Sequence, residues 1–97
     1  MEVLPYRNAL EPIIVEEVQR QLQDLPPQLV SYINPAQLIA FALNQLPPLY
    51  CTSKKGWKLQ QRKAKEKLAP QIHLAIHRGL LILQADPFKP ADLKLLE

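Results

Sequence analysis

LPPLYCTSKKGW, residues 46–57, lies between two segments with helical patterns and decides where one helix ends and the next begins. Pro47 and Pro48 end the earlier segment, because proline has no backbone N–H to donate to a helix. Ser53 is suited to open the later one, since a hydroxyl at a helix start accepts hydrogen bonds from free backbone N–H groups. The stretch also holds the only Trp, the only Cys and one of the two glycines of the chain. We therefore expect a helix break, a short loop and a capped helix start.

The segment before the loop is expected to be the central helix of the fold. Asn34 followed by Pro35 predicts its start, because Asn caps a helix and Pro fits the first helical position. The helix runs to about Gln45 and is mostly apolar, so it is expected to lie in the middle of the molecule. Its buried face consists of Leu38, Ile39, Ala42, Leu43 and Leu46. A single turn is expected ahead of it, within residues 28–33.

A first helix is expected over about residues 8–24. Its apolar residues recur at spacings of four and three and form one stripe, made of Leu10, Ile14, Val18, Leu22 and Leu25. The start has two readings. Asn8 and Glu11 have the spacing of a capping box, whereas Pro12 favours a start at its own position. The proline pair at residues 26–27 ends the helix.

The segment after the loop has a helical pattern from about residue 53 to residue 85. The stripe along it consists of Trp57, Ala64, Leu68, Ile72, Ile76, Leu80 and Leu83. Pro70 lies in the middle and either kinks one long helix or separates two, because it removes an internal hydrogen bond. Residues 87–97 are expected to form a loose tail.

Length and composition indicate one small helical domain. A chain of 97 residues has room for one modest core, which we place at about residues 8–86. No two segments alternate as paired strands would, so the expected fold class is all-α with about four helices. No apolar run approaches the ~20 residues that cross a bilayer, and the start lacks the pattern of a signal peptide. We expect a cytoplasmic protein without membrane insertion.

Positive charge gathers directly after the loop. Residues 1–25 hold five acids and two bases, whereas residues 54–67 hold seven bases and one acid. The seven bases are Lys54, Lys55, Lys58, Arg62, Lys63, Lys65 and Lys67. Such asymmetry creates a local positive field, which favours an anionic partner.

The loop and the start of this basic segment form a candidate cradle for phosphodiester groups. Thr52 and Ser53 would stand at a helix start, where free N–H groups and the helix dipole attract phosphate. Lys54 and Lys55 add point charges there, and Lys58 belongs to the same candidate set. The alternative is that Ser53 only caps a helix and that the lysines are solvated.

Three further side chains complete the candidate site. Arg62 is the only Arg of the basic segment and can bind a phosphate bidentately. Tyr50 and Trp57 could stack on nucleobases, which contributes roughly 1–3 kcal/mol for each base. Trp57 has a second reading as part of the core, since it shares a helical stripe with Ala64 and Leu68.

The sequence offers little for metal binding or catalysis. His73 and His77 have a spacing that can ligate zinc from one helix face, but Cys51 is the only plausible distant third ligand. A nucleophilic Cys needs a positioned base, and none is evident for Cys51. We expect no metal, no cofactor and no enzymatic activity.

Several stretches resemble the late competence development protein ComFB family. The longest is ALNQLPPLYCTSKKGW, residues 42–57, and the likeness extends over roughly residues 8–87. Outside that stretch it is carried by Asn8, Glu11, Val18, Ala40 and residues 25–27, 34–35 and 69–72. The resemblance implies a small helical homodimer that binds cyclic di-GMP or cyclic di-AMP and takes part in competence, pili and other bacterial responses. The resemblance also implies that some family members with several cysteines carry zinc, whereas Cys51 stands alone here.

The leading hypothesis is thus a non-enzymatic receptor that relays a cyclic dinucleotide signal through partner proteins. Its expected ligand-binding residues are Tyr50, Thr52, Ser53, Lys54, Lys55, Trp57, Lys58 and Arg62. One alternative is a nucleic-acid-binding protein that uses the basic face of residues 54–67. Another is a helical adaptor that binds no small ligand.

A homodimer is also expected from the apolar residues alone. Ile13 and Val15 lie off the stripe of the first helix, and Leu74, Leu81 and Ile82 lie off the stripe of the last. One small core cannot bury all of these side chains, so we expect a helix-mediated two-fold dimer.

Overall fold

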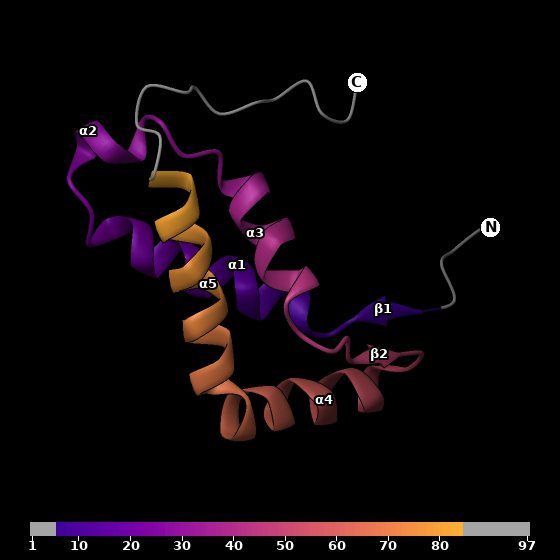
Figure 1. Cartoon of the computed structure of the whole chain (residues 1–97). Coiled ribbons are helices and arrows are strands. Elements are labelled where there is room, and N and C mark those ends of the chain that lie inside the picture. The colour runs from indigo at the N-terminus through magenta and orange to yellow at the C-terminus, as the bar shows by residue number, and fades with distance from the viewer. Residues whose placement is uncertain (1–5, 85–97) are drawn as a thin grey trace.

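A computed structural model describes residues 6–84, and its helices pack against one another around a common centre (Figure 1). The helices are α1 (Leu10–Gln23), α2 (Pro27–Val30), α3 (Pro35–Asn44), α4 (Lys54–Lys67) and α5 (Ala69–Gln84). The strands are β1 (Arg7–Asn8) and β2 (Tyr50–Cys51). The all-α prediction is confirmed, with only this two-stranded ribbon added. The predicted tail, residues 87–97, lies outside the described residues.

The core lies where α1, α3 and α5 meet, with one residue from α4. Its buried apolar side chains are Leu10, Ile13, Ile14, Val18, Ile33, Leu38, Ala42, Leu46, Ala64, Ile72, Ala75, Ile76 and Leu80. All three apolar stripes expected from the sequence contribute to this list. Gly79 lets α3 and α5 come close, since a Cβ there would lie 2.6 Å from Cδ1 of Leu38 and 2.9 Å from Cδ1 of Phe41.

The start of α1 agrees in part with the prediction that Asn8 caps the helix, and it excludes a start at Pro12. The helix begins at Leu10, after Ala9, whose side chain makes no capping bond. Asn8 lies one residue earlier, and its buried Oδ1 accepts hydrogen bonds from the backbone N of Leu10 at 3.0 Å and of Leu49 at 3.1 Å. Asn8 therefore serves the helix start from outside the helix, and it fastens the loop after α3 at the same time.

The predictions for the middle of the chain are confirmed. Asn34 caps α3, with its Oδ1 accepting from the N of Ala36 at 2.9 Å, and Pro35 is the first helical residue. The single turn appears as α2, which is four residues long. Ser53 caps α4, since its Oγ accepts from the N of Gly56 at 3.0 Å.

Pro70 separates two helices, which settles the alternative that the sequence left open. α4 ends at Lys67 and α5 begins at Ala69, so Pro70 is the second residue of α5. A proline is tolerated there because the first N–H groups of a helix have no intrahelical acceptor. The two helices meet at a sharp corner, which leaves α4 along one edge of the molecule (Figure 1).

The two-stranded ribbon was not expected from the sequence. β1 and β2 pair antiparallel, with Arg7 opposite Cys51 and Asn8 opposite Tyr50. The N of Ala9 extends the pairing by donating to the O of Leu49 at 2.8 Å. Strands of two residues are too short to show an alternating pattern, so the search for alternating segments did not detect them.

Apolar residues outside the stripes divide into two groups. On α1, Ile13 is buried within one chain and Val15 is partly buried. The expectation that one small core cannot bury Ile13 was therefore wrong. On α5, Leu74, Leu81 and Ile82 are 44%, 56% and 58% exposed.

Within residues 6–84, every helix is too short or too polar to span a membrane.

Candidate functional site

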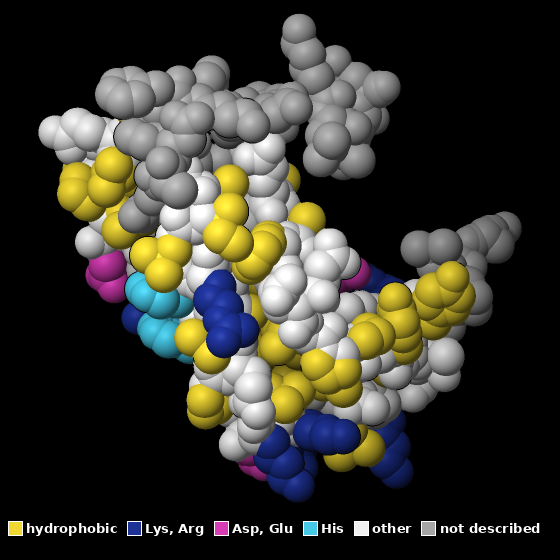
Figure 2. Space-filling model, in the orientation of Figure 1, with side chains coloured by type: hydrophobic (Ala, Val, Ile, Leu, Met, Phe, Trp, Pro, Cys, Tyr) yellow, Lys and Arg dark blue, Asp and Glu magenta, His cyan; other side chains and the backbone are white. Residues whose placement is uncertain are grey.

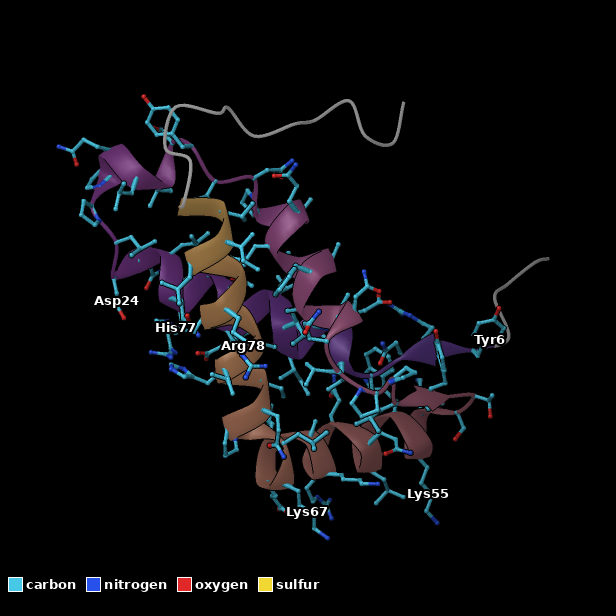
Figure 3. The ribbon with its side chains drawn as sticks, viewed as in Figure 1. Tyr6, Asp24, Lys55, Lys67, His77 and Arg78 are labelled. Atoms are coloured by element: carbon cyan, nitrogen blue, oxygen red, sulfur yellow. The ribbon has the colours of Figure 1, made fainter. Side chains whose placement is uncertain are left out.

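A hollow of about 410 Å³ opens between the ribbon and the start of α4. We call it the ribbon hollow. Its lining residues lie at β1, at β2, in the link from β2 to α4 and in the first turn of α4. They are Tyr6, Arg7, Cys51, Thr52, Ser53, Lys54 and Trp57. The hollow has a volume typical of small-molecule sites. Tyr6 lies at the outer end of β1 (Figure 3).

Arg7 supplies a cation that is already held in place. Its Cζ lies 5.0 Å from the centre of the Trp57 ring, within the range of a cation–π interaction. Strand pairing sets this position, because Arg7 pairs with Cys51 and the ribbon packs against α4. Cys51 Sγ also approaches the O of Arg7, at 3.4 Å.

The start of α4 adds backbone donors to the hollow. Ser53 Oγ accepts a hydrogen bond from the N–H of Gly56, which leaves its own O–H as a further donor. Within the described part of the chain, the N–H groups of Lys54 and Lys55 have no hydrogen-bond acceptor. Such free N–H groups at a helix start favour an anion, and Lys54 lines the hollow beside them.

Gly56 leaves room for the hydroxyl that caps α4. A Cβ at Gly56 would be 3.2 Å from Oγ of Ser53 and 3.5 Å from Cβ of Cys51. The first of these distances is tighter than an ordinary van der Waals contact. The glycine in the loop motif thus has a packing role next to the hollow.

Four of the eight residues predicted from the sequence meet in the ribbon hollow. These are Thr52, Ser53, Lys54 and Trp57. Trp57 is partly buried and also lines a second hollow beside α1, so it is a wall side chain more than a core one.

The other four predicted residues do not line the ribbon hollow, and their role in binding stays a prediction. Tyr50 is 58% exposed and meets Tyr6 edge to face, with ring centres 5.6 Å apart. Lys55, Lys58 and Arg62 are exposed on α4. Lys55 and Lys67 point away from the body of the molecule, at opposite ends of α4 (Figure 3).

Sequence reasoning missed Tyr6, Arg7 and Cys51 as members of this cluster. Cys51 was noticed but had no partner in the sequence, and Arg7 lies far from the loop along the chain. Only the pairing of β1 with β2 brings them to the start of α4. An aromatic residue followed by a base, just ahead of Asn8, was the one local signal.

A second polar cluster joins α1 to α5, away from the ribbon hollow. Glu17 forms an ion pair with Arg20 and accepts a hydrogen bond from Gln21 at 3.0 Å, and its Oε2 lies 3.4 Å from Nδ1 of His73. The hydrogen bond from Arg20 is the main cause that lowers the pKa of Glu17 to about 2, against a burial effect that raises it. The His73 and His77 rings stack, with centres 6.3 Å apart. Among residues 6–84, no three His, Cys, Asp or Glu side chains are grouped to hold a metal ion.

Comparison with known proteins adds one finding. The model of the family described as late competence development protein ComFB matches residues 7–87. No curated protein matches the chain. The matched region contains both strands, all five helices and every lining residue of the ribbon hollow except Tyr6.

Proposed function

The chain belongs to the late competence development protein ComFB family, and from this premise we propose that it is a non-enzymatic receptor for a cyclic dinucleotide. The ligand is cyclic di-GMP or cyclic di-AMP. It binds at the ribbon hollow, and the bound state is relayed to partner proteins in the cytoplasm.

One observation carries the proposal. Arg7, held over Trp57, and Lys54, at the start of α4, meet in one open hollow. A cyclic dinucleotide has two phosphates and two bases, so it needs cations, free N–H groups and flat apolar surfaces together. Arg7 and Lys54 neutralise phosphate charge, and the N–H groups at the helix start donate to phosphate oxygens.

The aromatic residues give the bases a place to stack. Tyr6 is 55% exposed and lines the hollow, and Tyr50 meets the Tyr6 ring edge to face. One face of Trp57 is occupied by Arg7, so Tyr6 offers the more open ring. Stacking is tolerant of base identity, which is consistent with either ligand.

The receptor is proposed to act as a homodimer that pairs through α5. Leu74, Leu81 and Ile82 leave apolar surface exposed on this helix, and a second copy would cover it. α5 follows α4 across the Pro70 corner, so a ligand that fixes the start of α4 can bias the position of the dimer surface.

Isothermal titration of the purified chain with cyclic di-GMP and with cyclic di-AMP tests this function. Saturable heat is expected with at least one of them at micromolar protein. Arg7→Ala should weaken binding by roughly 10- to 100-fold, since a charge-assisted hydrogen bond contributes about 1.5–3 kcal/mol. Arg78→Ala, at an exposed Arg outside the hollow, should bind like the wild type. Absence of heat with both ligands would overturn the proposal.

A further inference from the structure

α4 carries an excess of positive charge that the ribbon hollow does not use. Seven of its exposed side chains are basic, and Glu66 is its only acid. Across residues 6–84, none of these bases forms an ion pair or a side-chain hydrogen bond. Of the seven, only Lys54 lines the ribbon hollow.

The bases are distributed around the exposed arc of the helix. With about 100° between successive residues, Lys58 and Lys65 fall on one flank, Lys63 and Lys67 on the other, and Arg62 on the ridge between them. Basic side chains lie along the lower edge of the molecule, where α4 runs (Figure 2). The opposite side of α4 packs inward through Ala64, which is fully buried.

We propose that α4 docks in the major groove of double-stranded DNA. A helix with its side chains is about 10–12 Å wide, and the major groove of B-DNA is about 12 Å wide. A helix inside that groove has a phosphate strand on each side, so it needs cations on both flanks. α4 has that distribution, whereas a helix lying on a flat anionic surface needs cations on one side only.

Two alternatives fit the surface less well. Double-stranded RNA has a deep, narrow major groove that side chains cannot read. A helix that binds a lipid surface buries a broad apolar face, but the apolar side of α4 faces the core, and Leu59 is its one large apolar side chain more than half exposed.

The ridge residues suggest how α4 could meet base edges. Arg62 can donate to O6 and N7 of guanine, and Glu66 can accept from the amino group of cytosine. The flanking lysines contact phosphates and position the helix without reading sequence. The DNA-docking surface is therefore α4 from Lys58 to Lys67, and it goes beyond the cyclic dinucleotide site.

Fluorescence anisotropy with a labelled 20-base-pair DNA duplex of mixed sequence tests the docking surface. The assay contains no cyclic dinucleotide, so its result is independent of ligand binding. For about five neutralised phosphates, the logarithm of the association constant should fall with the logarithm of salt concentration with a slope of about −4.5. Lys63→Glu and Arg62→Glu should each weaken binding by about tenfold or more.

Arg78→Glu is the matched control, because it reverses the charge of an exposed Arg on α5. It should bind DNA like the wild type, provided that light scattering shows an unchanged mass. Circular dichroism should show unchanged helix content for all three variants. A slope shallower than about −2, or equal losses in Lys63→Glu and Arg78→Glu, would overturn the proposal. So would tighter binding to phosphatidylglycerol vesicles or to duplex RNA of the same length.

Discussion

Arg7 and Glu17 are charged side chains that contacts within the fold hold in place. Arg7 lies over Trp57, so its charge is ordered next to the hollow. Glu17 lies on α1, where it contacts Arg20 and Gln21 of the same helix. The first serves the proposed ligand, and the second contributes to the stability of the fold.

The ion pair of Glu17 predicts a loss of stability in acid. Folding lowers the pKa of Glu17 from its ordinary value of 4.5 to about 2, chiefly through the hydrogen bond from Arg20. The contribution is therefore fully present above pH 4.5 and is lost as the pH falls towards 2. Urea unfolding between pH 6 and pH 2 should show that the free energy of unfolding falls less steeply with decreasing pH in Glu17→Gln than in the wild type.

Glu16→Gln is the control for this experiment, because it removes the same charge from an exposed neighbour on α1. In Glu16→Gln the free energy of unfolding should fall with decreasing pH as steeply as in the wild type. The effect will be small, since Arg20 is exposed to water. Identical pH profiles for Glu17→Gln and the wild type would show that the ion pair does not stabilise the fold.

At this scale the sequence predicts local chemistry well and distant chemistry poorly. The roles of Ser53 and Asn34 as helix caps follow from their neighbours alone, and both were predicted. The place of Arg7 depends on the pairing of β1 with β2, and these strands lie more than forty residues apart in the sequence. The local pattern of an aromatic residue followed by a base does not say which segment Arg7 will meet.

Among the elements, the β1–β2 ribbon matters most for the site, because it brings Arg7 to α4. Asn8 links the ribbon to α1, since its buried Oδ1 accepts from two backbone N–H groups. Proline pairs and caps predicted the ends of the helices, because they act within one turn. The ribbon was missed because two-residue strands have no periodicity.

Replacing Asn8 with Ala should weaken both the fold and the site. The change leaves the N–H groups of Leu10 and Leu49 without their acceptor, and each unsatisfied buried group costs about 1–3 kcal/mol. Denaturant unfolding should therefore show a loss of at least about 1 kcal/mol. Asn44→Ala, at an exposed Asn at the end of α3, should unfold like the wild type. Equal stability of the two variants would contradict this role of Asn8.

On the scale of the whole molecule, two surfaces of different character lie on successive helices. α4 is basic, and its basic side chains lie along one edge of the molecule (Figure 2). α5 exposes Leu74, Leu81 and Ile82. The sequence predicted the exposure of these three α5 residues. It did not predict that Ile13 would be buried, because that depends on how α1 packs in three dimensions.

The proposed dimer predicts a clear response to a charge on α5. Light scattering of the wild type at micromolar concentration should give twice the chain mass of 11.1 kDa. Leu81→Asp should give a monomer, because it places a carboxylate in the apolar contact. Leu59→Asp, at a similarly exposed Leu on α4, should remain dimeric. A monomeric wild type, or equal masses for the two variants, would contradict pairing through α5.

Trp57 fluorescence tests most directly whether the ribbon hollow is the ligand site. Trp57 is the only Trp of the chain, and it lines both the ribbon hollow and the second hollow beside α1, so its emission responds to a ligand at either place. Lys54 lines the ribbon hollow and not the second one, so Lys54→Ala tells the two places apart. We predict a saturable change in emission on titration with cyclic di-GMP or cyclic di-AMP, with the midpoint shifted to higher concentration in Arg7→Ala. Calorimetric binding without any change in Trp57 emission, or with equal midpoints for Arg7→Ala and the wild type, would contradict the account.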